Sequence, residues 1–262
     1  MKNYKQLAFL IAMMMTGGEA MAQAASTGPN KVYVEQVGSS NTVTIQQVGG
    51  SNNVGGTAGS ATVSTTAPGG ITTLAATAPS SSNYGTITGS SNIVGITQTG
   101  DANSAQYNIK GNTNVYNSTV TGNTNQTKLT IGNANINAMR NTVTETVTGD
   151  NNMIIQNITG SDTVSTTSIT GNSNQVTSEQ SSNYGTVSNT ISGASNVVNI
   201  QQTDSGTHQL ALNTSGDYNS ITTQQQGSNN TTMNIQTTGN HNTVTVRSSS
   251  SAIASPATAI AR

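Results

Sequence analysis

Amide side chains at a regular spacing are the groups in this sequence best placed to do chemistry together. The element Gly-x-x-Asn recurs with its glycines eleven residues apart, as in Gly38-Ser-Ser-Asn41 and Gly49-Gly-Ser-Asn52. An Asn side chain offers one carbonyl acceptor and two N–H donors. Identical amides that repeat at a fixed period can therefore hydrogen-bond to one another in a column.

The same element continues along most of the chain, at Gly89, Gly100, Gly111, Gly122, Gly149, Gly171, Gly193, Gly216, Gly227 and Gly239. A fixed short period indicates a stack of like units. The first unit shows what one unit is. Its Asn41, Val43, Ile45 and Gln47 share one parity, so a strand would place them on one face. Gly and small polar residues then favour a turn.

Equivalent residues recur in every second unit. Asn152, Asn174, Asn196, Asn219 and Asn242 are separated by 22, 22, 23 and 23 residues. Two residues after each Asn stand Ile154, Val176, Val198, Ile221 and Val244, and six residues after three of them stand Gln180, Gln202 and Gln225. Asn92 and Gln98 repeat the same step of six. We therefore predict an all-β, parallel β-solenoid with strand-turn-strand rungs of about 22 residues, in which these residues form self-assembly ladders.

The intervening units are less regular. Those that start at Asn141, Thr163, Gly185, Gln209 and Asn230 place Val143, Ser165, Val187, Ala211 and Thr232 at the matching position. Glu145 falls on the inward parity, where we expect a register shift or a rim position rather than a buried carboxylate. Met153 with Ile155, and Met233 with Ile235, fall on the outward parity and would suit either a lateral contact between filaments or a strand buried on both sides.

Composition excludes several functional classes. Charged residues make up 6% of the chain and aromatic residues 3%, and Cys and Trp are absent. His208 and His241 have no partner at a spacing typical of a metal site, and we expect both to be exposed turn residues. No serine stands in a nucleophile elbow, and no phosphate-binding loop is present. The sequence thus predicts no enzyme activity, no cofactor and no metal site.

The N-terminal segment is typical of a secretory signal. Lys2 and Lys5 precede an apolar run from Leu7 to Met15, and Ala20-Met21-Ala22 follows. We assign residues 1–22 to a signal peptide, although cleavage after Ala24 fits the pattern equally well. No later segment approaches the roughly 20 apolar residues of a membrane span. Cleavage after Ala22 would leave 8−2=6 basic and 9−1=8 acidic residues, a balance that disfavours nucleic-acid binding.

Proline marks the boundaries of the repeats. Proline cannot donate to a strand ladder, and Pro29, Pro68, Pro79 and Pro256 all fall outside the periodic units. The expected organisation is a signal peptide at 1–22, a linker at 23–31, the first solenoid units at 32–54, an irregular insert at 55–88, the main repeat domain at 89–247 and a mobile tail at 248–262.

The unit Gln36-x-Gly38-x-x-Asn41-x-Val43-x-x-x-Gln47 resembles the curlin repeat of curli, the bacterial extracellular amyloid fibres. The resemblance covers most of the chain from Val32 to Arg247. It implies a secreted subunit of a cell-surface fibre, with roles in biofilm matrix and adhesion. As partners it implies further copies of the chain, a nucleator subunit and an outer-membrane secretion pore. Several units depart from the pattern, because Asn103, Asn114, Asn125 and Asn152 lack the Gln six residues later.

Two other functions remain open from the residues alone. A monomeric secreted β-solenoid that acts as an adhesin, or binds ice or carbohydrate, would need a flat outward array such as Thr42 with Thr44 begins to offer. A disordered polar chain is the third, and the phased aliphatic residues argue against it. For assembly, we expect the end strands at Val32–Gln36 and Thr243–Arg247 to dock head to tail. Asp101, Asp150 and Asp217 follow turn glycines, where they would favour the turn, slow assembly by repulsion or hold a cation weakly.

Overall fold

The computed structural model is all-β and describes residues 9–15, 20–24, 30–55, 62–65, 72–75, 85–216, 219–239, 241–250 and 257–261. No helix occurs among them, and so none that could span a membrane. The strands are β1 (Phe9–Met15), β2 (Ala20–Ala24), β3 (Lys31–Val37), β4 (Asn41–Val48), β5 (Asn53–Val54), β6 (Thr62–Thr65), β7 (Thr72–Ala75), β8 (Gly85–Thr88), β9 (Ile93–Thr99), β10 (Ser104–Lys110), β11 (Val115–Thr121), β12 (Gln126–Ile131), β13 (Thr142–Thr148), β14 (Met153–Ile158), β15 (Val164–Thr170), β16 (Gln175–Gln180), β17 (Thr186–Ser192), β18 (Val197–Thr203), β19 (His208–Thr214), β20 (Ser220–Gly227), β21 (Thr231–Thr237), β22 (Thr243–Ser250) and β23 (Ala257–Ala261).

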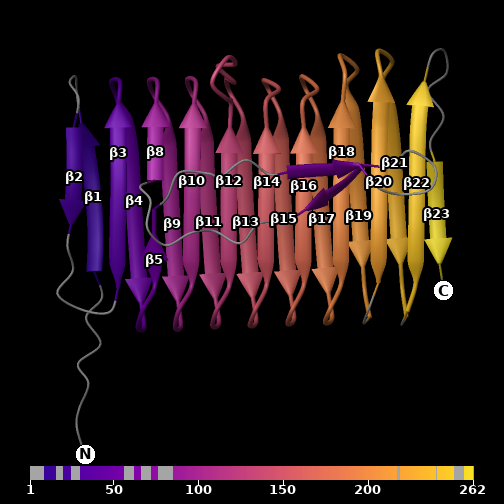
Figure 1. Cartoon of the computed structure of the whole chain (residues 1–262), viewed down its shortest axis with the longest axis horizontal. Coiled ribbons are helices and arrows are strands. Elements are labelled where there is room, and N and C mark those ends of the chain that lie inside the picture. Colours follow the sequence, from indigo (N-terminus) through magenta and orange to yellow (C-terminus); the bar gives the residue numbers. More distant parts are fainter. Residues whose placement is uncertain are drawn as a thin grey trace, which may run out of the picture.

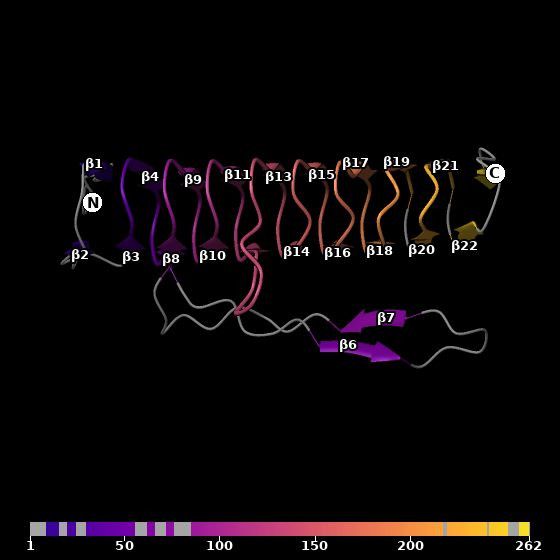
Figure 2. The ribbon, with the colours of Figure 1, turned by 90° about the horizontal axis from the view of Figure 1, so that it is seen from above.

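Two long sheets face one another and form a β-solenoid, which confirms the predicted fold (Figures 1 and 2). We call them sheet A, with the order β1-β4-β9-β11-β13-β15-β17-β19-β21-β23, and sheet B, with the order β2-β3-β5-β10-β12-β14-β16-β18-β20-β22. From β3 and β4 onward every pairing in these two sheets is parallel. The chain alternates between the sheets, so one strand of each makes a rung and consecutive rungs stack along the long axis.

Glycine is required at the turns because successive turns lie directly over one another. Gly122 has φ +121, and a Cβ placed on it would lie 2.0 Å from the carbonyl oxygen of Gly149 in the next rung. The residue before each ladder Asn adopts the left-handed conformation, as Thr124 does with φ 57. This combination turns the chain out of one sheet and into the other without making a hairpin.

The core lies between the two sheets and consists of one inward row from each strand. Aliphatic residues such as Val94, Ile154 and Val198 are fully buried there. Alternation of buried and exposed residues is regular in sheet A, as the pattern of β4 from Asn41 to Val48 shows. Parallel in-register stacking therefore converts a sequence period of about 22 residues into straight rows of like side chains.

The insert is shorter than the sequence predicts and interrupts a strand in its middle. Val32 of β3 pairs with Val54 of β5, and Val34 pairs with Gly85 of β8, so only Gly55 lies between these two partners. Residues 85–88, expected in the insert, therefore belong to sheet B and complete the strand that residues 53–55 begin. The distance of 51 residues between Asn41 and Asn92 agrees with this, since it exceeds a 22-residue rung by 29, the length of 56–84.

Within the insert, β6 and β7 pair antiparallel, and this hairpin lies on the outer side of sheet B (Figure 2). β7 is close to β16. On the outer face of sheet B, alternating residues such as Gln106, Lys128 and Ile155 are buried. The two outer faces of the solenoid thus differ, because sheet A carries exposed side chains at its outward positions.

Both ends of the chain add strands that the sequence did not predict. β1 pairs antiparallel with β4, and β2 pairs antiparallel with β3. At the other end, Ser248–Ser250 continue β22, and β23 pairs with β21. The expected tail at 248–262 therefore contributes to both sheets. The four prolines lie outside the described residues.

Sheet A shifts its register by one residue at β19. Gln209 pairs with Thr186 and Ala211 with Ser188, so Leu210 and Leu212 point inward, and in β21 Met233 and Ile235 do so too. The expected inward positions of Ala211 and Thr232, and the outward positions of Met233 and Ile235, were wrong. The cause is the longer spacing of 23 residues, as between His208 and Thr231. Asn230 and Gln236 are accordingly exposed.

Candidate assembly site

The principal candidate site is a column of asparagine side chains along sheet B. Its members precede the strands of that sheet and occupy corresponding turns. We call it the B column; it comprises Asn30, Asn52, Asn103, Asn125, Asn152, Asn174, Asn196, Asn219 and Asn242. The last of these is half-buried and the rest are buried.

Each interior amide of the B column is fully satisfied by its neighbours. Asn125 Nδ2 donates to Asn103 Oδ1 at 3.1 Å and to the Gly149 carbonyl at 2.7 Å. Its own Oδ1 accepts from the backbone N–H of Asn152 at 2.9 Å and from Asn152 Nδ2 at 3.1 Å. Every side-chain bond of this kind points the same way along the axis, with the later residue as donor. The column is therefore directional.

A second column, the A column, runs along sheet A and changes its chemistry halfway. Asn41, Asn92, Asn114 and Asn141 repeat the amide pattern. Thr163 then replaces Asn and donates its hydroxyl to Asn141 Oδ1 at 2.8 Å.

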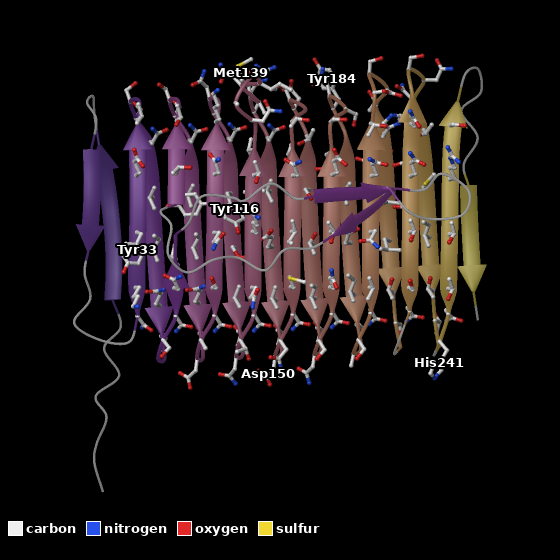
Figure 3. The ribbon with its side chains drawn as sticks, in the orientation of Figure 1. Tyr33, Tyr116, Met139, Asp150, Tyr184 and His241 are labelled. Atoms are coloured by element: carbon white, nitrogen blue, oxygen red, sulfur yellow. The ribbon has the colours of Figure 1, made fainter. Side chains whose placement is uncertain are left out.

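His208 occupies the A column further along and is fully buried, so the expectation that it lies exposed in a turn was wrong. Its Nδ1 lies 2.7 Å from Thr231 Oγ1, and its Nε2 lies 2.8 Å from the Thr203 carbonyl. The register shift of sheet A moves His208 from the turn into the position that Asn holds elsewhere. His241 lies exposed in a turn, as expected (Figure 3).

Glutamine side chains close the far end of the strands and join the two sheets. Gln202 Nε2 donates to Gln225 Oε1 at 2.6 Å and to the Thr186 carbonyl of sheet A at 3.3 Å. Gln180 donates to Gln202 at 3.2 Å, and Gln47 donates to Gln98 at 2.9 Å. In rungs without Gln, aliphatic residues such as Val120 and Ile131 fill the same rows.

The structure brings the predicted ladder residues together. Asn41, Val43, Ile45, Gln47, Asn92, Gln98, Asn152, Ile154, Asn174, Val176, Gln180, Asn196, Val198, Gln202, Asn219, Ile221, Gln225 and Val244 are all buried, and Asn242 is half-buried. Sequence reasoning missed as ladder members Asn30, Asn52, Asn103, Asn114, Asn125 and Asn141. The Gly-x-x-Asn phase marks most of these, but a step of 27 residues between Asn125 and Asn152 breaks the period of 22.

Glu145 is buried between the sheets, and the expectation of a register shift or a rim position for it was wrong. Its Oε2 accepts from the Tyr116 hydroxyl at 2.7 Å, and its Oε1 accepts from Gln156 Nε2 at 2.9 Å. Ser165 donates to Gln156 Oε1 at 2.6 Å. Burial raises the pKa of Glu145 to about 7, against the opposing effect of these hydrogen bonds. Burial and the carboxylate together raise the pKa of Tyr116 well above its ordinary value.

The turn aspartates make contacts that suit a stacking role. Asp101 accepts from the backbone N–H of Gly50 at 2.6 Å, and Asp150 accepts from that of Asn123 at 2.7 Å. Asn112 and Asn172 make the same contact in other turns. The carboxylates thus perform a task that neutral amides also perform. Asp217 lies outside the described residues.

The C-terminal end of the B column is incomplete. Asn242 Nδ2 donates to the carbonyls of Thr238 and Gly239, at 2.8 and 3.2 Å, instead of to Asn219. Asn219 Oδ1 is buried and has no hydrogen-bond partner. At the opposite end, Asn30 Nδ2 donates to the Gly49 carbonyl at 3.0 Å. Within the described residues, no rung follows Asn242.

Comparisons with protein-family models, with curated proteins and with solved structures found no match to this chain.

Proposed function

We propose that this chain is a secreted structural subunit that assembles head to tail into extracellular, curli-like amyloid fibres. The observation that carries the proposal is the directional B column, which has a donor end at Asn30 and an acceptor end at Asn242. A stack of this kind can continue through a second copy without any new kind of contact, because each rung already binds the next by the same bonds.

The ends of the sheets support this proposal. β22 is the outermost strand of sheet B, and one side of its backbone faces away from β20. An open strand edge presents unpaired N–H and C=O groups that accept another strand. At the other end, β1 and β2 pair with β4 and β3. Removal of residues 1–22 would take away all of β1 and most of β2, and would open the edges of β3 and β4.

Docking would also repair the incomplete end of the column. In the interior pattern, the later Asn donates its backbone N–H and its Nδ2 to the earlier Oδ1. In a fibre, Asn30 of the following copy would donate in this way to Asn242 Oδ1. The terminal rung would then be held on both sides, and Asn242 Nδ2 could turn to Asn219 Oδ1. An unpaired buried acceptor costs about 1–3 kcal/mol, so this step favours growth at that end.

The resemblance to curli extends the proposal to place and partners. It implies export to the cell surface, a role in biofilm matrix and adhesion, a nucleator subunit and an outer-membrane secretion pore. The residues that would carry assembly are those of the two columns, not a catalytic group. No His, Asp or Glu cluster suited to a metal occurs in the described part of the chain.

A direct test uses the chain that begins at residue 23. Fibres with diffraction spacings near 4.7 and 10 Å are expected. Val34→Pro or Val244→Pro removes a backbone donor from an end strand and should leave soluble particles. Val34→Thr and Val244→Thr, which keep that donor, are the controls and should still form fibres. Undiminished fibre growth by both proline variants would refute end-to-end docking.

A monomeric adhesin is the second candidate, and one observation favours it. The outer face of sheet A carries threonines in register on neighbouring strands, such as Thr119 beside Thr97 and Thr146. The sequence alone suggested only fragments of such an array. A signal-free chain that stays monomeric at high concentration, with full strand content, would favour this candidate.

A further inference from the structure

Charge is segregated between the two outer faces of the solenoid. The outward charged residues of the long strands are Lys31, Glu35, Lys110, Lys128, Glu179 and Arg247, and all of them lie in sheet B. The outward positions of sheet A, from Thr42 in β4 to Gln236 in β21, hold no charged residue. We call these outward positions of the eight strands from β4 to β21 the threonine face.

Hydroxyl side chains form two regular columns on this face. The first is Thr97, Thr119, Thr146, Ser168 and Thr190. Two residues further along the same strands runs the second, Thr99, Thr121, Thr148, Thr170 and Ser192. Each threonine offers a methyl group as well as a hydroxyl group. Such a face has β-branched residues, no charge and no proline, which is the composition of sheets that pair tightly through their side chains.

Aliphatic residues on the same face remain in contact with water. Ile93 is 46% exposed and Val164 is 44% exposed. Both lie in one column with Val115 and Thr142. The β6–β7 hairpin lies on the side of sheet B, and no described strand lies over sheet A (Figure 2). The threonine face is therefore open and partly apolar, whereas the charged face is partly covered.

We infer that the threonine face packs against the same face of a second copy, so that the fibre consists of two stacks joined laterally. This inference rests on the proposed assembly and adds the contact between stacks. A like face is the occupant that fits best, because an uncharged surface meets no repulsion from its own copy and equal column spacings allow the threonines to interdigitate.

The area of the face is sufficient for a specific contact. Eight strands about 4.8 Å apart, each about 7 residues long at roughly 3.3 Å per residue, cover about 900 Å². Stable protein–protein interfaces bury about 800 Å² on each partner. In a fibre this contact would repeat for every copy, so even weak pairing per copy would hold two stacks together.

Charge placed on the face tests the inference. Thr119→Lys with Thr146→Lys puts two lysines on neighbouring strands of the threonine face. The control is Thr130→Lys with Asn157→Lys, an in-register pair on the outer face of sheet B, with the same spacing and the same mutual repulsion. The measurement is mass per length of fibres grown from the chain that begins at residue 23.

We expect the parent and the control to show the mass per length of two stacks, and the threonine-face variant to show about half of that while it still elongates. Single-stack fibres from the parent, or double stacks from the variant, would overturn the inference. Single stacks that adsorb to ice or polysaccharide through this face would overturn it in favour of that surface. If the parent forms no fibres, the proposed function fails, and sedimentation decides the pairing: a dimer that only the threonine-face variant loses supports it, and a monomeric parent refutes it.

Discussion

The hydroxyl group of Tyr116 in β11 donates a hydrogen bond of 2.7 Å to the carboxylate of Glu145 in the neighbouring strand β13. Both side chains are buried between the sheets, where an ionised carboxylate is unfavourable. The pair marks the part of the core at which the stack responds to pH.

Stability should fall as the pH rises through the range that Glu145 controls. The folded protein holds the Glu145 proton up to a pKa of about 7, whereas the unfolded chain releases it near 4.5. Between these values the folded state binds more protons, so the free energy of unfolding decreases with rising pH, by about 3 kcal/mol in all. Denaturant unfolding at a series of pH values from 4 to 8 measures this loss.

Glu145→Gln should remove that pH dependence, because the amide keeps the shape and cannot ionise. The difference between parent and variant isolates Glu145 from every other titrating group. An equal slope against pH in the two proteins would show that Glu145 does not carry the effect.

An interior member and a terminal member of the B column should behave differently. Asn125→Ala leaves Asn103 Oδ1, the Gly149 carbonyl and the donors of Asn152 without their partner. The free energy of unfolding should fall by about 3 kcal/mol or more. Asn242→Ala breaks only bonds within its own turn and should cost less than about 1 kcal/mol, yet it should slow seeded elongation.

Chemical unfolding and seeded growth, run on both variants, separate the two roles. If Asn242→Ala elongates at the parental rate, the amide at that end takes no part in docking. Asn242→Gln retains an amide at a different reach and serves as the matched comparison.

The stacked turns should not tolerate a side chain at glycine. Gly122→Ala places a Cβ 2.0 Å from the Gly149 carbonyl oxygen, in a backbone conformation that disfavours alanine. We expect a loss of more than about 3 kcal/mol, measured by thermal or denaturant unfolding. Thr124→Gly, two residues later in the same turn, relieves a positive φ of 57 and should change stability by less than about 1 kcal/mol. Equal effects at the two positions would contradict the stacking argument.

Deletion of residues 56–84 should leave the solenoid intact. Gly55 and Gly85 would join β5 to β8 as one strand, since their neighbours already pair with successive positions of β3 and β10. The deleted chain should keep its cooperative unfolding and expose more of the outer face of sheet B. Hydrogen exchange of β5 and β8 gives the readout: lost protection in these strands would show that the insert is needed to form them.

Much of the fold follows from local features of the sequence. The alternation Asn41, Val43, Ile45, Gln47 specifies a strand with one inward face, and Gly followed by Asn specifies the turn. Because the period is nearly constant, the B column from Asn152 to Asn242 could be predicted from residue spacing alone. Upstream, loops of different length at 56–84 and around 132–138 break the period, and the column members there were missed.

The remaining features depend on which residues the rungs bring side by side. One extra residue in a 23-residue rung moves His208 from a turn into the core and reverses the faces of β19 and β21. The burial of Glu145 could not be predicted because its partners, Tyr116 and Gln156, lie in other strands. The splicing of β5 to β8 likewise requires the flanking strands β3 and β10 as a template.

By itself, the sequence determined the repeating unit, its inward amides and the parallel stack, because these depend on alternation and turn chemistry within about 22 residues. Only the tertiary structure decided the register of each rung, the burial of His208 and Glu145 and the placement of all strand charges on the outer face of one sheet or inside the core. The physical reason is that registry depends on the length of every connection between neighbouring strands, and a shift of one residue exchanges the inner and outer faces.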